Sequence, residues 1–288
     1  MSAAGYSIED LGRPIKGPSA LGTDPRRLWH LTWTLAVTEW RLRFFGSALG
    51  YIWQLLRPLA IFAVLYVVFV NVFSAGSLVP FYPEALLLGI VMFTFFNEAT
   101  KGCVTALVER EPLVRKVDFP RLAIPLSIVI TATFNLALNL LPVIVFLLID
   151  GGSVRWTWLE LPVIVFLLAA FSVGIGMLLS ALFVRYRDIE PIWDVALQIM
   201  FYAVPVFYPI ELVIEKWNEK IARVIVANPF AAALQQARYA LLGPGHLSAV
   251  AALGQPWRIV FPVGLALGIF ALGWWVFSRR APTIAEDL

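Results

Sequence analysis

The stretch LAIPLSIVITATFNLALNLLPVIVFLLI, residues 122–149, contains no charged side chain. An α-helix rises about 1.5 Å per residue and needs about 20 apolar residues to cross the roughly 30 Å hydrocarbon core of a bilayer. This stretch is therefore long enough to span a membrane as one helix. Its Asn135 and Asn139 are four residues apart and share a helical face, which favours hydrogen bonds to a neighbouring helix or subunit.

Apolar runs of the same kind lie on both sides of this stretch. The predicted spans are 51–73, 85–108, 122–149, 159–184, 192–208 and 259–277, of which the fifth is the shortest. Hydrophobic residues make up 60% of the chain and charged residues 14%, which leaves too little polar surface for a water-soluble fold. We therefore predict an all-α, multi-pass membrane protein with six transmembrane helices.

The basic residues alternate from loop to loop. Loop 74–84 has none and loop 150–158 has only Arg155, whereas five basic residues lie around the connection between the second and third spans. Because basic residues resist translocation, they gather in cytoplasmic loops. The alternation predicts that both termini are cytoplasmic. The long fifth loop is also basic, but long loops carry little weight in this rule.

The chain before the first span divides into two parts. Residues 1–22 are rich in glycine and proline and are predicted to form a flexible cytoplasmic leader, and residues 23–288 to form the transmembrane domain. Within that domain, residues 25–45 read as a helix with Trp29, Trp33, Trp40 and Phe44 on one stripe and Arg27 and Arg41 opposite. This pattern predicts an amphipathic helix lying at the membrane surface.

The segment between the last two spans is too long for a simple hairpin and too apolar for an ordinary loop. It reads as two short helices broken at Asn228-Pro229, because a residue before proline avoids the α region. Non-spanning helices at this place favour a re-entrant hairpin. We predict outer gate helices over about 211–242, with Asn228, Pro229, Gln235 and Arg238 as gate residues.

Glu98, Lys101 and Arg57 are charged residues within the predicted spans. Glu98 and Lys101 are three residues apart on one helical face and are predicted to form an intramembrane pair, with either a functional role or a purely structural one. Arg57 lies one turn into its span and either extends back to the interface or meets an anionic head group. Cys103 is single and the two histidines are far apart, so no metal site is predicted.

The chain lacks the motifs of energised or hydrolytic chemistry. It contains no G-x-x-x-x-G-K-[ST] phosphate loop, no H-E-x-x-H and no G-x-S-x-G, so no catalytic residue is predicted. We also find no internal repeat typical of gradient-driven carriers. If the protein does energised work, the energy comes from another chain or from an ion gradient, and the missing repeat disfavours the gradient.

Residues 108–125, VEREPLVRKVDFPRLAIP, are the most charged part of the connection between the second and third spans. Pro112 and Pro120 bracket room for about two helical turns with apolar Val114, Val117 and Phe119. From composition alone, this segment is equally a solvated turn that enforces topology or a short amphipathic helix that inserts into a soluble partner.

Five segments, in this order, carry a resemblance to a known family. They are GSALGYIWQLLRPL (46–59), LVRKVDFPRLAIPLS (113–127), VRYRDIEPIWDVALQIMFYAVPVFYP (184–209), NPFAAALQQARYALLG (228–243) and the tail RRAPTIAEDL (279–288). With six spans and an amphipathic N-terminal helix, the chain from about Pro25 to Leu288 resembles the permease subunits of bacterial ABC-type-2 exporters of lipid-linked polysaccharide. These export O-antigen, capsule and teichoic acid.

The resemblance implies a partnership. Two permease chains would form a homodimer and join two ATPase subunits, which alone would carry ATP and Mg, in the bacterial cytoplasmic (inner) membrane. Membrane lipids and a lipid-linked polysaccharide are the other expected partners, and nucleic acid is not. The resemblance places ATPase-coupling contacts at Leu113, Val114, Arg115, Lys116, Val117, Asp118, Phe119, Arg185, Arg187 and Asp188.

The substrate path is a further expectation. Sugar rings stack on aromatic side chains, and a lipid pyrophosphate needs cations near the inner leaflet. The candidate aromatics are Tyr51, Trp53, Tyr66, Phe201, Tyr202 and Phe207, and the candidate cations are Arg41, Arg43 and Arg57. Ordinary interfacial aromatic belts and arginines that reach the interface explain the same residues equally simply.

Two other functions remain open at this point. An ABC-type-2 exporter of a drug or small lipid would share the fold. A membrane enzyme acting on polyprenyl-linked sugars would use Glu98 or Asp188 as a base, and would be active without any ATPase.

Overall fold

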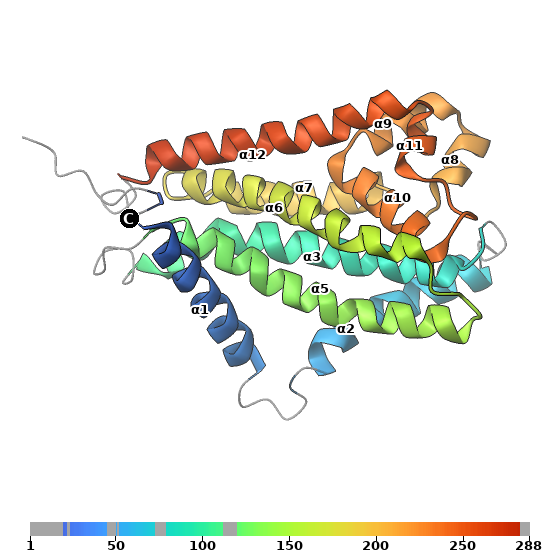
Figure 1. Ribbon diagram of the computed structural model, residues 1–288, viewed down its shortest axis with the longest axis horizontal. Coiled ribbons are helices and arrows are strands. Elements are labelled where there is room, and N and C mark those ends of the chain that lie inside the picture. Colours follow the sequence, from blue (N-terminus) through green and yellow to red (C-terminus); the bar gives the residue numbers. More distant parts are fainter. Residues whose placement is uncertain are drawn as a thin grey trace, which may run out of the picture.

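The computed structural model describes residues 20–21, 24–44, 50, 52–72, 79–111 and 120–282. Within these ranges the protein consists of helices and contains no strand, as predicted. The long helices α3, α5, α6 and α12 run side by side along the long axis of the molecule (Figure 1). The bundle comprises α2 Ile52–Tyr66 with its π-helical extension Val67–Val72, α3 Tyr82–Glu109, α5 Ala123–Ile149, α6 Leu161–Phe183, α7 Ile189–Ala203 and α12 Val260–Arg280.

Five helical segments in the described residues are long and apolar enough to cross a membrane. They are Ile52–Val72, Tyr82–Glu109, Ala123–Ile149, Trp156–Phe183 and Pro256–Arg280. They correspond to five of the six predicted spans. The remaining prediction, 192–208, coincides with α7, which has 15 residues and so rises only about 22 Å. It ends before Pro205 because the preceding Val204 takes an extended conformation (φ −92°, ψ 155°).

Helix α3 is the centre of the bundle. It packs against α2, α5, α6, α7 and α10, and most of its side chains are buried. The approach to α6 is close, because a Cβ added at Gly176 would lie 2.7 Å from Cys103 Sγ. Phe96 continues this contact by stacking on Phe171 at 5.7 Å between ring centroids. The centre of the molecule is therefore an apolar contact between α3 and α6.

Helices α6 and α12 meet at a pair of glycines. A Cβ at Gly174 would lie 2.6 Å from Phe270 Cα, and a Cβ at Gly273 would collide with the carbonyl oxygen of Gly174. Absence of side chains at both positions lets the two backbones touch. This contact attaches the last helix to the bundle.

The two ends of the bundle differ. Short helices gather at one end, and the end of α12 lies at the other (Figure 1). The short helices are α8 Ile210–Lys216, α9 Glu219–Val226, α10 Pro229–Leu242 and α11 Ala249–Leu253. Asn228 Oδ1 accepts a hydrogen bond from Phe230 N at 2.9 Å and caps α10. The helix break expected at Asn228-Pro229 is therefore present, although the segment expected as one helix before it is divided into α8 and α9.

Helix α1, Pro25–Phe44, lies obliquely against α5 (Figure 1). Thr32 and Ala36 are buried in the contact, and Trp33 and Trp40 place their rings edge-on to Phe134 at 5.6 and 5.8 Å. Part of the tryptophan stripe thus packs on protein. The position of α1 at the membrane surface stays a prediction.

Candidate functional site

A cavity of about 310 Å³ lies between α3 and α7. Its lining residues are Phe93, Asn97 and Lys101 of α3, and Asp194, Leu197, Gln198, Phe201 and Tyr202 of α7. Lys101 Nζ and Asp194 Oδ1, 2.7 Å apart, form an ion pair in its wall. The cavity combines aromatic faces, two amides and a neutralised charge pair. We refer to it as the aromatic cavity.

The aromatic rings of this cavity continue into a larger cluster. Phe93 and Phe201 are 4.9 Å apart between ring centroids, and Phe201 and Tyr202 are 5.3 Å apart. Phe207, in the loop after α7, lies 5.9 Å from both Phe201 and Tyr202 and 5.2 Å from Phe69 of the π-helical turn. The cluster therefore joins three segments of the chain, and Tyr202 is its most exposed ring at 61%.

Three of the six predicted substrate-path aromatics belong to this cluster. Tyr66 instead packs on Phe62 of its own helix at 5.6 Å, and Trp53 is exposed near the start of α2. Tyr51 lies outside the described residues. Phe93 and Phe69 are the aromatics of the cluster that sequence reasoning missed, because nothing in an apolar helix distinguishes them from their neighbours.

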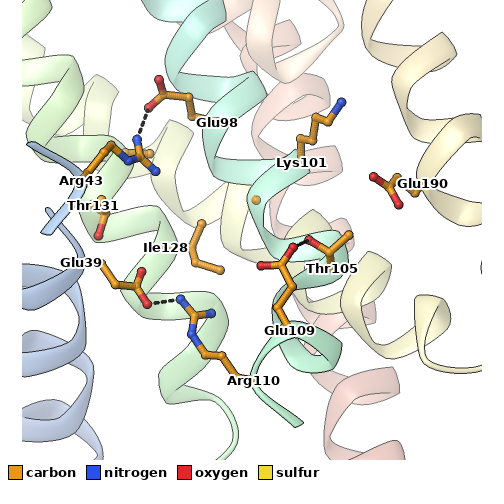
Figure 2. A pocket seen from close by; sticks show the side chains of 12 residues that line it. Glu39, Arg43, Glu98, Lys101, Thr105, Glu109, Arg110, Ile128, Thr131 and Glu190 are labelled. Atoms are coloured by element: carbon orange, nitrogen blue, oxygen red, sulfur yellow. Dashed lines mark hydrogen bonds and ion pairs between the residues drawn. The ribbon is translucent and has the colours of Figure 1, made fainter. Parts of the chain in front are cut away.

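A second, charged cavity of about 380 Å³ lies toward the other end of α3 (Figure 2). Its charged lining residues are Glu39, Arg43, Glu98, Lys101, Glu109, Arg110 and Glu190. Figure 2 shows two ion pairs between α1 and α3, Arg43 with Glu98 and Glu39 with Arg110. Four carboxylates against three cations make this cavity slightly acidic, so it does not favour a free anion.

Glu98 and Lys101 each have a different ionic partner. Glu98 accepts hydrogen bonds from Asn135 Nδ2 at 2.7 Å and Gln54 Nε2 at 3.2 Å, and lies 3.7 Å from Arg43 Nη1. Lys101 points away from Glu98 (Figure 2), and its Nζ lies 2.7 Å from Asp194 Oδ1 of α7. Their separation of three residues turns them about 60° apart around α3, so each reaches a different neighbouring helix. The described ion pairs thus differ from the predicted pairing.

The carboxylate of Glu98 joins four helices. Gln54 comes from α2, Arg43 from α1 and Asn135 from α5. Asn135 Oδ1 in turn accepts a hydrogen bond from Trp40 Nε1 at 3.1 Å. The interhelical role expected for Asn135 is therefore present, and the network connects α1 to the bundle.

The three arginines predicted to meet a lipid pyrophosphate come from two helices. Arg43 is held by Glu98, whereas Arg41 and Arg57 are exposed on α1 and α2. A phosphate at Arg43 would have to compete with Glu98 for the guanidinium.

The predicted ATPase contacts divide between described and undescribed residues. Leu113 to Phe119 lie outside the described residues. Arg185, Arg187 and Asp188 form an exposed turn between α6 and α7, at the same end as the end of α12. There Arg187 lies over the ring of Phe183 at 5.0 Å. This turn presents charge at the end of the bundle opposite α8–α11.

Two of the predicted gate residues, Gln235 and Arg238, are buried polar side chains at the other end. Arg238 is 2% exposed and donates to the carbonyl oxygens of Val206 at 2.8 Å, Tyr208 at 3.3 Å and Ala85 at 3.3 Å. Burial lowers the pKa of Arg238 to about 10, with the nearby Glu211 carboxylate opposing the shift. The guanidinium therefore stays charged at neutral pH. It ties the loop after α7 to α3 and α10.

His246 lies near Arg238 and has no counterpart among the predicted site residues. Its Nε2 lies 2.9 Å from the carbonyl oxygen of Pro80 and is buried. Burial, reinforced by the charge of Arg238, lowers the pKa of His246, and Glu211 partly opposes this. Gln235 donates to the carbonyl of Leu247 at 2.7 Å on the same side of α10. These side chains fix α10 and its flanking loops.

Comparisons with known proteins agree with this architecture. Residues 30–242 match the ABC-2 type transporter family. The chain is 29% identical to the O-antigen export system permease protein RfbA of Myxococcus xanthus over 180 residues, which cover 62% of this chain and 68% of that protein. It is 26% identical to two proteins of the same name from Klebsiella pneumoniae over 206 residues, covering 71% of this chain and 77% of each. This chain belongs to the ABC-2 type transporter family.

Proposed function

We propose that this protein is the membrane permease subunit of an ATP-driven exporter of a lipid-linked polysaccharide of the O-antigen type. The similarity to three O-antigen export permeases over most of the chain supports this function. Because the chain has no phosphate-binding loop, a separate ATPase would bind ATP and Mg and hydrolyse the nucleotide.

The observation that carries this proposal is the chemistry of the aromatic cavity. Phe201 and Tyr202 offer ring faces on which the C–H faces of sugars stack. Asn97 and Gln198, in the same wall, can both donate and accept hydrogen bonds with sugar hydroxyls. A polymer of neutral sugars needs weak contacts of this kind, since tight binding would stop its movement.

Two copies of the chain would enclose the path between them. The segment Ile52–Val72 has little buried surface within one chain, and its Phe69 contacts Phe207, which in turn contacts Phe201 and Tyr202 of the aromatic cavity. A partner copy on this side would turn an open wall into a channel. The six-span topology with both termini in the cytoplasm of the inner membrane is part of the same proposal, with α7 and the loop to Pro209 as the fifth crossing.

The end of the bundle that carries residues 185–188 would meet the ATPase. The exposed charges of Arg185, Arg187 and Asp188 suit a contact with a soluble partner. Residues 113–119 would provide the second contact as a coupling helix. The outer helices α8–α11 would then form the gate at the opposite end.

Replacement of Tyr202 tests the role of the aromatic cavity. We expect Tyr202→Ala to lower polysaccharide export about two- to tenfold, because one aromatic stacking contact contributes about 0.5–1.5 kcal/mol. Export is measured as surface polysaccharide in cells whose own gene is deleted and replaced by the variant. Lipid-linked polymer should accumulate inside those cells.

Phe166→Ala is the matched control, since Phe166 is 70% exposed on α6 and does not line the cavity. It should leave export unchanged at equal protein level. Normal surface polysaccharide in the deletion strain itself would refute the proposed function. Normal export by Tyr202→Ala alone would refute only the cavity as the sugar path.

A further inference from the structure

A third cavity, of about 480 Å³, lies on a different side of the molecule from the aromatic cavity. It is a groove between the first halves of α6 and α12, with α10 and α11 forming the rest of its wall. It reaches Phe270, where α6 and α12 come into contact through Gly174. The groove therefore occupies the space between two helices that touch near their middles, at the end where the short helices gather.

The groove has apolar walls and opens at the surface of the molecule. Small residues of four helices make room for it, namely Ala170, Ala232, Ala233, Ala249 and Ala266. Val163 and Leu167 on α6 and Leu267 on α12 line its mouth and are 43–59% exposed. Both helices belong to candidate membrane spans, so this mouth faces hydrocarbon when the protein is in a bilayer.

Two exposed tryptophans indicate where the groove lies along the membrane normal. Trp156 and Trp257 are 88% and 58% exposed, and they lie in the 3₁₀ turns that lead into α6 and α12. Exposed tryptophans at the ends of spans sit at the headgroup level of a membrane. The groove begins directly after them, at Leu159 and Ile259. Its upper end is thus close to the lipid headgroups, and its remainder extends toward the middle of the bilayer.

The groove has one charged side chain at this upper end. Among the described residues that line it, only Glu160 carries a charge, and its Oε2 accepts a hydrogen bond from Gln236 Nε2 at 2.7 Å. Gln236 Oε1 in turn accepts a hydrogen bond from Ala249 N at 3.1 Å. The hydrogen bond from Gln236 holds the Glu160 carboxylate at the mouth of the groove. Its negative charge favours a cationic ligand over an anionic one.

We propose that this groove binds a glycerophospholipid with an ammonium headgroup, of the phosphatidylethanolamine type. One acyl chain fills the space between α6 and α12, and the ammonium pairs with Glu160. Charge complementarity selects this occupant over a polyprenyl pyrophosphate, whose anionic head would be repelled by the same carboxylate. The bound lipid packs α10 against two spans, at a place separate from the path proposed for the polymer.

Native mass spectrometry of the delipidated full chain tests this proposal. Phosphatidylethanolamine, phosphatidylglycerol and undecaprenyl phosphate are titrated in turn. We expect phosphatidylethanolamine to bind about two- to fivefold more tightly than phosphatidylglycerol, the range that one partly exposed ion pair provides. Glu160→Gln should bring that ratio close to one while it keeps an oxygen that accepts from Gln236.

Blocking the groove gives the second test. Ala266→Phe fills the space from α12, and Ala233→Phe fills it from α10, so that one variant remains if the other fails to fold. Each should lower bound phosphatidylethanolamine at least about fivefold, because an acyl chain loses several buried methylene groups. Leu265→Phe is the matched control, because Leu265 neighbours Ala266 but is 49% exposed and does not line the groove.

Three outcomes would overturn the proposal. They are equal affinity for the two phospholipids, tighter binding of undecaprenyl phosphate, and unchanged lipid binding in both groove-filling variants. A dimer that disappears in the groove-filling variants would show instead that a second copy of the chain covers the groove. None of these results depends on export, so failure here leaves the proposed function untouched.

Discussion

A single side chain, Arg238, holds together the end of the molecule where the short helices gather. It donates to carbonyl oxygens of Ala85, Val206 and Tyr208, which belong to two segments about 120 residues apart. Gly89 makes room for this arrangement, because a Cβ there would collide with the carbonyl oxygen of Val206. A buried charge of this kind costs desolvation free energy, and its three acceptors offset that cost.

The neighbouring His246 predicts a pH dependence of stability. Its pKa is lowered in the folded protein from an ordinary value of 6.5. On acidification through that value the unfolded chain takes up a proton before the folded one, so stability falls as the pH drops. We expect the Tm of the wild-type protein to fall more between about pH 7.5 and about pH 5.5 than the Tm of His246→Gln.

His30→Gln serves as the control, since His30 is exposed on α1. It should keep the pH dependence of the wild type. Thermal unfolding in detergent at a series of pH values measures all three proteins. Parallel curves for the wild type and His246→Gln would contradict the prediction.

Among the helices, the contact between α6 and α12 depends on two residues without side chains. Its geometry predicts that Gly273→Ala destabilises the protein by about 1–3 kcal/mol, the usual cost of overpacking, because the added Cβ meets the backbone of Gly174. Backbone cannot move aside as a flexible side chain can. Differential scanning fluorimetry should report a lower Tm.

Gly264 lies on the same helix and offers a matched substitution. A Cβ at Gly264 would meet nothing within 4 Å. Gly264→Ala should therefore leave Tm unchanged or raise it, since alanine is favoured over glycine in a helix by up to about 1 kcal/mol. If both variants lowered Tm equally, helix packing at Gly174 would not be the cause.

The bundle as a unit has two chemically different ends. One carries α8–α11 and exposed Trp217, and the other carries the turn with Tyr186 and the end of α12. Charge alternation in the sequence assigns the first end to the outside and the second to the cytoplasm. This orientation is a prediction that labelling can test.

Cysteine labelling addresses that orientation directly. On a Cys103→Ser background, we expect Trp217→Cys to react with a membrane-impermeant maleimide in intact spheroplasts. Tyr186→Cys should react only after the membrane is permeabilised. Both side chains are at least half exposed, so access to reagent and not burial decides the result. The reverse pattern would invert the topology.

Local signals in the sequence predict some elements well. Asn228-Pro229 predicts the start of α10, because a capping side chain precedes a proline at the first helical position. Pro205 predicts the end of α7 at Ala203, although the apolar run in the sequence continues to Tyr208. A prediction from hydropathy extends to the end of the apolar run and takes no account of the proline. The predicted fifth span therefore extends beyond the end of the helix.

Contacts between distant segments could not be predicted in the same way. Glu98 was paired with Lys101 on spacing alone, whereas its partners Arg43 and Asn135 are dozens of residues away. Phe201, Tyr202 and Phe207 are aromatics that the sequence predicts for sugar stacking, and they contact one another because they are close in sequence. Phe93 and His246 were missed, because their roles arise only from the packing of α3 and of the loop after α10.

The attachment of α1 also has a consequence for biosynthesis. Trp40 bonds to Asn135, a residue that the ribosome adds 95 positions later. At about 5–20 residues per second, this delay is about 5–20 s. Throughout that interval α1 has left the ribosome without its docking surface. Helix α1 therefore cannot be seated until α5 has been made, and until then the surrounding lipid must shelter its tryptophans.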